Sequence, residues 1–123
     1  MEYPSSWSVD SKKHQTEKAF CCLNARARDF AKLGRLFLND GNWNGQQIVS
    51  KKWVDETTNF TEKGYHYQWW REPSKKYDDF YAQGILGQYV YVNRDTNTII
   101  VRLGKKYGSV YWERLFRVIA SKV

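Results

Sequence analysis

The first feature of this sequence that could carry chemistry is the triplet Tyr91-Val92-Asn93, in which a phenol and a carboxamide stand two residues apart. In serine acyl transfer, a Ser-x-x-Lys motif places a lysine one helical turn from the nucleophilic serine and activates it. No lysine in this chain has a serine three positions before it. The triplet also ends an alternating strand pattern, so Asn93 is predicted to open a turn rather than to bind substrate.

Other signatures of reactive sites are missing from the sequence. It contains no Gly-x-Ser-x-Gly nucleophile elbow and no Gly-rich phosphate loop ending in Lys-Ser or Lys-Thr. His14 and His66 are the only histidines, and neither has metal-ligand spacing to Cys21 and Cys22. We therefore expect no metal and no cofactor. Neighbouring Cα atoms lie about 3.8 Å apart, below the usual range for a disulfide, so the cysteines are predicted to be two buried thiols.

The composition is typical of one folded domain with a basic surface. Of 123 residues, 41% are hydrophobic, 17% are aromatic and 27% are charged, which is enough for a single core. The net charge of +7 is scattered rather than gathered in a block, which favours a solvated surface. The alternative is a binding module, whose basic, Trp- and Tyr-rich sheet would stack on a nucleic acid or a glycan. No nucleic-acid-binding motif supports it, so nucleic acid is disfavoured as a partner.

Helical periodicity is strongest at residues 25–39, where apolar side chains recur at three- and four-residue intervals. Asn24 is the expected N-cap of this helix, and Gly41 lies just past its end. A broad apolar stripe predicts that the helix is well buried. Ser50 is expected to cap a second, short helix over residues 51–58.

Alternation of side chains predicts a series of strands in the second half of the chain. They are expected at residues 65–70, 79–83, 88–93 and 97–103, with the second and third separated by Gly84 to Gly87. Polar loops and turns are expected between the elements, at residues 40–45, 59–64, 71–78 and 104–108.

The two ends of the chain differ in their patterns. Residues 1–23 show no sustained period, whereas residues 110–121 read as a helix with Ser109 as its cap. Trp112, Leu115, Phe116 and Ile119 mark its expected apolar face, and a Glu113–Arg117 ion pair is expected along the helix. The order of helices and antiparallel strands predicts the α+β class.

Two long stretches carry a specific pattern. The first runs from Cys22 to Val54 and includes Ala-Arg-Asp-Phe-Ala-Lys-Leu-Gly-Arg-Leu, then Leu-Asn-Asp-Gly-Asn-Trp-Asn-Gly-Gln-Gln-Ile-Val-Ser. The second comprises residues 67–70, 80–93 and 97–104. In order and spacing both resemble the C-terminal part of the serine β-lactamase-like hydrolases, a bacterial superfamily of class C β-lactamases, penicillin-binding proteins and related esterases. The resemblance spans roughly residues 3–121.

This resemblance implies a partial β-lactamase-like, or transpeptidase-like, domain. Residues 1–123 would form a single partial domain in which residues 1–23 are an irregular lead-in. The fold would be an antiparallel sheet of about three to five strands, flanked by an N-terminal-side helix and a C-terminal helix. In the superfamily the nucleophilic Ser-x-x-Lys and the Tyr-x-Asn motif lie upstream of the matching region. The resemblance thus implies no catalytic residue in this chain.

The superfamily's third motif, Lys or His followed by Thr or Ser and Gly, falls by this resemblance on Ala82, Gln83 and Gly84. Ala82 has no charge with which to hold a substrate carboxylate. Gly84 is retained, and the resemblance makes the Ile85 N–H one of two oxyanion-hole donors. Gln83, Gly84 and Ile85 would thus form a substrate-binding wall. Read without the resemblance, they are a strand with a bulge.

The resemblance implies that the parent performs acyl transfer on a small β-lactam, peptide or ester substrate, and that this chain alone is inactive. Its first partner would be the missing N-terminal part of the parent domain. Trp69, Trp70, Tyr89 and Tyr91 are expected to be exposed, favouring self-association or domain swapping through a strand edge. No apolar run suits a membrane span or a signal peptide. The chain leaves its compartment open, and the resemblance implies a periplasmic or secreted parent.

Overall fold

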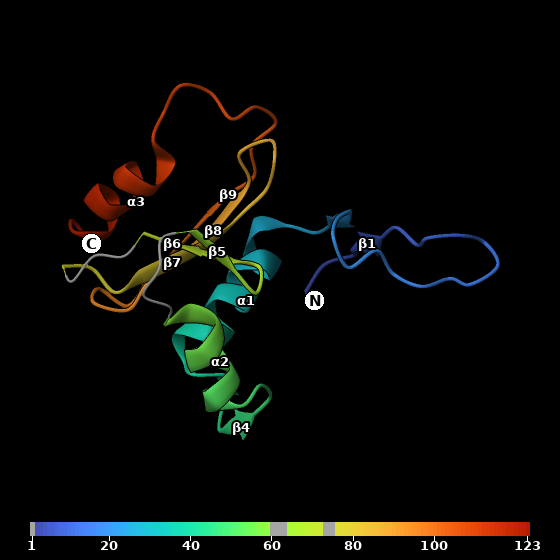
Figure 1. Ribbon diagram of the computed structural model, residues 1–123, viewed down its shortest axis with the longest axis horizontal. Helices are drawn as coiled ribbons and strands as arrows, with labels where there is room; N and C mark the ends of the chain where they lie inside the picture. Colours follow the sequence, from blue (N-terminus) through green and yellow to red (C-terminus); the bar gives the residue numbers. More distant parts are fainter. Residues whose placement is uncertain (1, 60–63, 73–75) are drawn as a thin grey trace.

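A computed structural model describes residues 2–59, 64–72 and 76–123. Five antiparallel strands form the main sheet, in the spatial order β5-β6-β7-β8-β9 (Figure 1). Their bounds are β5 Gly64–His66, β6 Trp69–Arg71, β7 Asp79–Gln83, β8 Tyr89–Asn93 and β9 Thr98–Arg102. Three helices accompany the sheet: α1 Ala27–Leu38, α2 Lys51–Thr58 and α3 Trp112–Ala120. The predicted α+β class and antiparallel sheet are confirmed.

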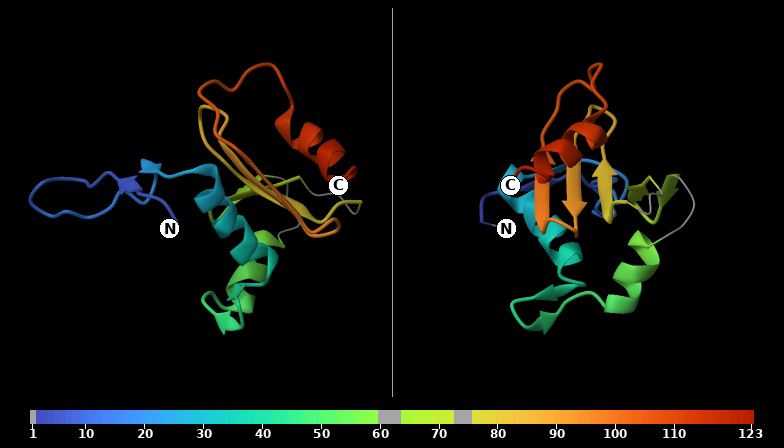
Figure 2. Two further views of the ribbon diagram at one scale, coloured as in Figure 1. Left: turned by 180° about the vertical axis from the view of Figure 1, so that it is seen from behind. Right: turned by 90° about the vertical axis from the view of Figure 1, so that its left-hand side faces the viewer.

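Strand β8 lies at the centre of the core because both of its faces are covered. Tyr89 and Tyr91 point toward α3 and pack against Phe116, whereas Val90 and Val92 point toward α1. Figure 2 shows α3 on one face of strands β7 to β9 and α1 on the other. Every residue of β8 is buried, as expected for a central strand covered on both sides.

The aromatic residues expected at the surface are mostly in the core, so that prediction is wrong. Trp69, Tyr89 and Tyr91 are each less than 5% exposed, and Trp70 is partly buried. Trp69 packs between Phe37 of α1 and Phe80 of β7. The helices supplied by this chain are sufficient to cover these rings.

Helix α1 has the predicted extent but not the predicted cap. Asn24 lies in the two-residue strand β2 (Leu23–Asn24), and Arg26 occupies the N-cap position without a side-chain hydrogen bond. At the other end the Gly41 N–H donates to the Leu36 carbonyl at 2.8 Å, with Gly41 at φ +81°. Gly41 thus closes the helix as predicted. Leu33 is 43% exposed, so the buried stripe is narrower than expected.

Helix α2 begins where its cap predicts. The Ser50 side chain accepts a hydrogen bond from the Trp53 N–H at 3.2 Å, which satisfies one free donor of the first turn. The preceding segment forms a small hairpin of β3 (Asn42–Trp43) and β4 (Gln46–Gln47). Asn44 and Gly45 at its tip both have positive φ, which accounts for the turn residues noted there. Residues 60–63 and 73–75 of the loops expected at 59–64 and 71–78 lie outside the described residues, whereas Gly64 begins β5 and Arg71 ends β6.

The single strand predicted at residues 65–70 is wrong. Tyr67 and Gln68 adopt φ angles of 44° and 74°, which turn the chain back on itself between β5 and β6. Tyr65 then pairs with Trp70 across the hairpin. The alternation of side chains continues through both strands of the hairpin. The sequence pattern therefore gave no sign of the two-residue turn, which lacks the Gly or Asn that such turns usually contain.

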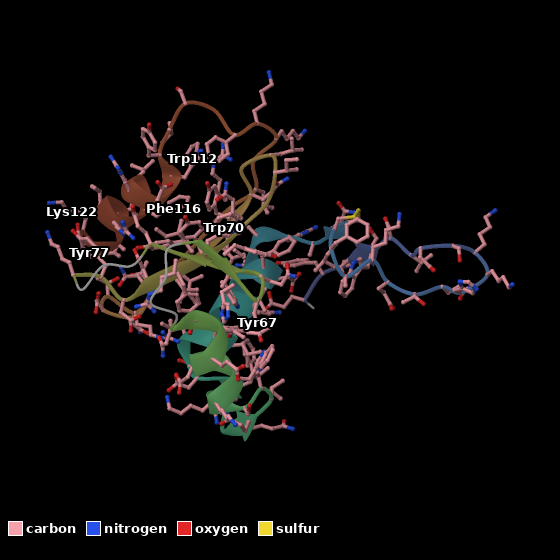
Figure 3. All side chains as sticks on the ribbon, viewed as in Figure 1. Tyr67, Trp70, Tyr77, Trp112, Phe116 and Lys122 are labelled. Atoms are coloured by element: carbon pink, nitrogen blue, oxygen red, sulfur yellow. A yellow bond between two sulfur atoms is a disulfide. The ribbon has the colours of Figure 1, made fainter. Side chains whose placement is uncertain are left out.

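Helix α3 is held by different contacts from those expected. Its N-cap is Tyr111 rather than Ser109, and Arg117 pairs with Asp79 and Glu72 instead of with Glu113. Phe116 and Trp112 point from α3 toward the sheet in Figure 3. Phe116 is buried, whereas Leu115 and Ile119, which also belong to the predicted apolar face, are 39% and 40% exposed. Within the expected apolar face of α3, the side that carries Phe116 therefore packs against the sheet.

The N-terminal residues form an arm that extends away from the sheet (Figure 1). Its base is the pairing of β1 (Ser6–Trp7) with β2, and its two sides meet again at Val9 and Glu17. The adjacent cysteines are joined as a disulfide, and Cys22 is exposed, which corrects the prediction of two buried thiols. The arm has no core that could bury them. Among the described residues, none of the helices has the length and the apolar composition of a membrane span.

Candidate functional site

Ala82, Gln83 and Gly84, which resemble the third superfamily motif in position, lie at the end of β7. One edge of this strand has no strand partner there. Strand β8 pairs with all five residues of β7, from Asp79 to Gln83. On the other side, β6 is in register with β7 at one pair within the described residues, Trp70 with Tyr81. The backbone beyond Tyr81 therefore has a strand partner on its β8 side alone.

The alternation of backbone hydrogen bonds along β7 shows which backbone groups face that open edge. The Gly84 N–H donates to the Gln88 carbonyl at 2.8 Å, so it points toward β8. In an antiparallel strand, successive residues direct their N–H and C=O groups to alternate edges. The polar backbone groups of Gln83 thus point away from β8, and Ile85 follows Gly84 in the turn beyond the strand. No hydrogen bond to the Ile85 N–H is present among the described residues.

The three predicted wall residues are brought together at the tip of the β7–β8 hairpin. Gln83 ends β7, and Gly84 to Gly87 form a tight turn in which the Gly87 N–H donates to the Gly84 carbonyl at 2.9 Å. The segment is thus a strand end followed by a turn, not a bulge. Ile85 stands at the apex with its side chain 93% exposed.

Gly84 packs closely against the side chain of Gln88. A Cβ at Gly84 would lie 2.5 Å from the side-chain oxygen of Gln88. That oxygen accepts a hydrogen bond from the Leu86 N–H at 3.1 Å, which ties the turn to the start of β8. A larger residue at 84 would displace this contact, so the glycine preserves the shape of the hairpin tip.

The side chain of Arg102 in β9 holds the tip of the β7–β8 hairpin in place. Its guanidinium donates to the carbonyls of Gly87 and Lys106 and lies 3.8 Å from the ring centroid of Trp112. Trp112 in turn donates its indole N–H to the Tyr107 carbonyl at 2.7 Å. The tip is thus connected to β9, to the following loop and to α3. Sequence patterns gave no sign of this support because its partners are distant along the chain.

Tyrosines beside the site are held in the protonated form. Burial raises the pKa of Tyr81 to about 12, and the carboxylates of Glu113 and Glu72 act in the same direction. Burial also raises the pKa of Tyr89, and the neighbouring Tyr107 adds to that effect. Neither phenol is a base at neutral pH. A general base would therefore have to come from elsewhere.

Tyr91 and Asn93 are structural, as their strand pattern predicts. The Tyr91 hydroxyl donates to Asp79 at 2.8 Å and accepts from the Asn93 side chain at 3.1 Å. The Asn93 side-chain oxygen accepts from the Thr96 N–H at 2.9 Å and so opens the β8–β9 turn. Burial raises the pKa of Tyr91 as well. Tyr91 and Asn93 are both buried in the core.

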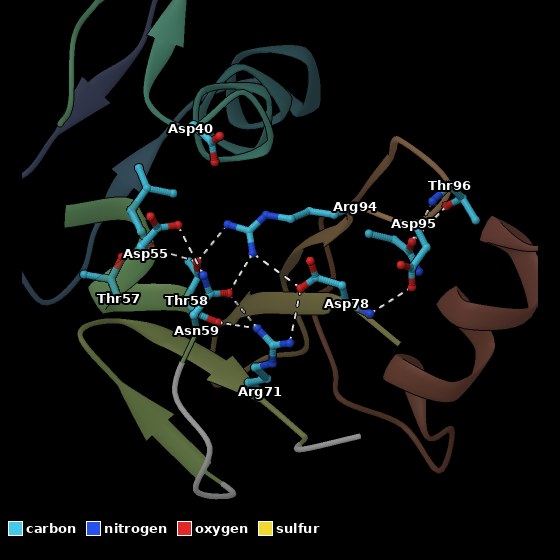
Figure 4. Close-up of polar contacts among 12 residues, drawn as sticks. Asp40, Asp55, Thr57, Thr58, Asn59, Arg71, Asp78, Arg94, Asp95 and Thr96 are labelled. Carbon is cyan, nitrogen blue, oxygen red and sulfur yellow. Dashed lines mark hydrogen bonds and ion pairs between the residues drawn. The ribbon is translucent and has the colours of Figure 1, made fainter. Parts of the chain in front are cut away.

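A cluster of arginines at the opposite end of the sheet is also structural. Figure 4 shows Arg71 and Arg94 converging on Asp78 and on the end of α2. Arg71 donates to the Thr58 carbonyl at 2.6 Å, and Arg94 donates to the Thr58 hydroxyl at 2.9 Å. These bonds satisfy groups at the helix C-terminus, where positive charge is favourable. Part of the positive charge of the chain is thus neutralised by contacts within the fold.

Two further site types find no support in the described part of the chain. No group of three or more His, Cys, Asp or Glu side chains there could hold a metal ion. The faces of strands β7 to β9 are covered by α1 and α3, so these three strands offer no open platform on which a base or a sugar could stack.

Comparison with known proteins finds relatives both by sequence and by structure. No protein-family model matches the chain. A 6-aminohexanoate-dimer hydrolase of Paenarthrobacter ureafaciens is 29% identical over an alignment of 96 residues, and the match covers 66% of this chain and 24% of that protein. A solved structure from Bacillus anthracis, named for the same activity, has a TM-score of 0.81 and 27% identity, covering 96% of this chain and 34% of that one.

These likenesses support a superfamily, the serine hydrolases with the β-lactamase and penicillin-binding-protein fold. The chain spans about a quarter of the length of the curated relative and about a third of the solved one. The larger part of each relative therefore has no counterpart among these 123 residues.

Proposed function

We propose that this chain supplies one wall of the active-site cleft of a β-lactamase-related serine hydrolase and is catalytically inactive alone. The observation that carries the proposal is the open edge of β7, where the Ile85 N–H has no partner among the described residues. A backbone N–H aimed at a developing oxyanion stabilises the transition state of acyl transfer. Because the donor belongs to the backbone, the identity of residue 85 matters little.

The missing chemistry defines what a partner must provide. Acyl transfer needs a nucleophile and a base together with charge stabilisation. The sequence has no Ser-x-x-Lys, and the buried tyrosines near the site are protonated. The nucleophile, its lysine and the second oxyanion donor would reside on the part of the parent that precedes the matching region.

The substrate class follows from the residues at the wall. Ala82 stands where the superfamily has a cation, so this strand offers no charged group to a substrate carboxylate. The relatives are named for a dimer of 6-aminohexanoate, whose two units are joined by an amide. We infer that the parent cleaves an amide or ester whose acyl group is recognised by backbone hydrogen bonds rather than by a cation at position 82.

A chimaera tests the proposal directly. This chain would replace the matching segment of the Paenarthrobacter hydrolase, and hydrolysis of the 6-aminohexanoate dimer would be measured. Ile85→Pro removes the N–H and should lower kcat by about 100-fold or more, whereas Ile85→Ala keeps the N–H and should stay close to the parent chimaera. Equal rates for the two variants in a folded, active chimaera would overturn the oxyanion role.

A further inference from the structure

The two cysteines of the chain form a disulfide at the base of the N-terminal arm, which comprises residues 2–24 (Figure 3, yellow). Cys22 is exposed and Cys21 is partly buried. Exposed disulfides are more often labile or regulatory than buried structural ones, because a thiol reagent can reach them. The disulfide of this chain therefore lies where an external thiol can attack it.

Cys22 has a backbone conformation that its side chain disfavours. Its φ angle is 77°, in the left-handed region, where a Cβ atom crowds the following carbonyl oxygen. Glycine enters this region freely, but cysteine does not. The bond to Cys21 closes a small covalent ring that contains the peptide between the two residues, and this ring restricts rotation about the N–Cα bond of Cys22. The ring therefore supports a conformation that a free cysteine would leave.

The backbone of the two cysteines joins the two sides of the arm. The Cys22 carbonyl accepts a hydrogen bond from the Ser8 N–H at 3.3 Å. The indole N–H of Trp7 donates to the carbonyls of Cys21 and Lys18, each at 3.0 Å. A rotation about the N–Cα bond of Cys22 turns the Cys21 side of the chain relative to the Cys22 carbonyl. The contacts of Ser8 and Trp7 therefore cannot both persist after such a rotation.

A separate set of contacts attaches the arm to α1 and involves neither cysteine. The Glu2 N–H donates to the Asp29 carboxylate at 2.8 Å. The Arg26 guanidinium lies 3.9 Å from the ring centroid of Tyr3. A change at the cysteines is therefore expected to loosen the arm from Trp7 outward, while these contacts and the core remain.

We propose that Cys21 and Cys22 form a redox switch that controls the closure of the arm. One thiolate of a small dithiol attacks a cysteine sulfur and displaces the other cysteine, and the second thiol group of the reagent then displaces the first cysteine. The dithiol leaves as a cyclic disulfide, its two electrons pass to the protein, and its two protons end on the cysteine thiols. Cys22 then leaves the left-handed region, and the contacts of Trp7 and Ser8 open. The switch includes none of residues 83–85, so it is independent of the proposed hydrolase function.

Hydrogen exchange followed by NMR on the isotope-labelled chain tests the switch. The oxidised chain is compared with the chain treated with dithiothreitol, and alkylation with mass spectrometry counts the free thiols in each. On reduction, the Ser8 amide and the Trp7 indole N–H should exchange at least about 5-fold faster, because the left-handed conformation loses its support. The amides of Val90 and Val92 in β8 should be unchanged, which would show that the core stays folded.

Two variants at position 22 separate the backbone conformation from the loss of the covalent bond. Both are kept in dithiothreitol, so that neither forms a disulfide. Cys22→Gly takes a positive φ without a steric penalty and should keep the arm closed, so the Ser8 amide should exchange more slowly than in Cys22→Ala. Cys22→Ala should behave like the reduced chain, and the β8 amides again report whether each variant is folded.

Three results would each overturn the proposal. The first is a disulfide that dithiothreitol does not reduce in the folded chain. The second is equal exchange of the Ser8 amide in the oxidised and reduced chains. The third is equal exchange in Cys22→Gly and Cys22→Ala, which would mean that the left-handed conformation of residue 22 does not govern the closure of the arm.

Discussion

The guanidinium of Arg117 in α3 binds the carboxylate of Asp79 in β7 through two hydrogen bonds, of 2.5 Å from Nε and 2.9 Å from Nη2. Asp79 is 1% exposed, and it also accepts the hydroxyl hydrogen of Tyr91. The third helix is therefore fixed to the sheet by a buried, bidentate ion pair as well as by the packing of Phe116.

Breaking this pair from the arginine side should destabilise the fold strongly. Arg117→Met leaves the Asp79 charge buried without its cation, which costs about 3–5 kcal/mol in comparable pairs. Asp79→Asn should cost less, because Arg117 keeps Glu72 at 3.1 Å. Urea unfolding would measure both, with Lys122→Met, at an exposed position just after the same helix, as the control. An Arg117→Met loss no larger than that of the control would contradict the structural role of the pair.

Gly34 permits α1 to approach the sheet closely. A Cβ at this position would lie 2.9 Å from Cγ2 of Ile99 and 3.2 Å from Cγ1 of Val90, both on stiff β-branched side chains. Gly34→Leu should therefore lower the free energy of unfolding by about 1–3 kcal/mol through overpacking, despite its better helix propensity. Leucine at exposed Arg28, on the same helix, is the matched control. A Gly34→Leu protein as stable as this control would mean that the helix can move away at no cost.

Stability should fall in alkaline solution because of the buried tyrosines. The folded-state pKa of Tyr81 is raised to about 12 by burial, above its usual value of 10.0. A group with a raised folded-state pKa contributes stability that is complete below pH 10 and is lost as pH rises toward 12. Tyr81→Phe should therefore flatten part of the decline in unfolding free energy between these pH values. Urea titrations at several pH values would show it; an unchanged slope would place Tyr81 in contact with solvent.

The isolated chain should hydrolyse neither the 6-aminohexanoate dimer, nor a chromogenic β-lactam, nor an activated ester above the buffer blank. In the proposed function it offers at most one oxyanion donor, and its sequence has no nucleophile in the motif that the superfamily uses. Product release would be followed with purified chain, and a Gly84→Val variant would serve as a probe of the proposed wall. Turnover that this substitution abolishes would show that the chain holds a complete active site, contrary to the proposal.

The local elements of this protein were readable from the sequence because they depend on short-range chemistry. The 3.6-residue period predicted α1, the Ser50 hydroxyl predicted the start of α2, and alternation with Gly-rich turns predicted β7, β8 and β9. The wall segment at Gln83 was found through its resemblance to a superfamily, not through local pattern. Its role remains a proposal that the chimaera would test.

The tertiary structure decided which residues far apart in the sequence contact one another. Alternation alone ran through Tyr67 and Gln68 without revealing the turn, because both strands of the hairpin continue the same period. The partner of Arg117 changed from Glu113, four residues away, to Asp79 across the core, since a buried bidentate contact outweighs an exposed pair on one helix. Likewise, whether Tyr89 and Tyr91 were buried depended on where α3 packs. Residues adjacent in sequence determine propensity, but burial and pairing arise only when separate elements meet.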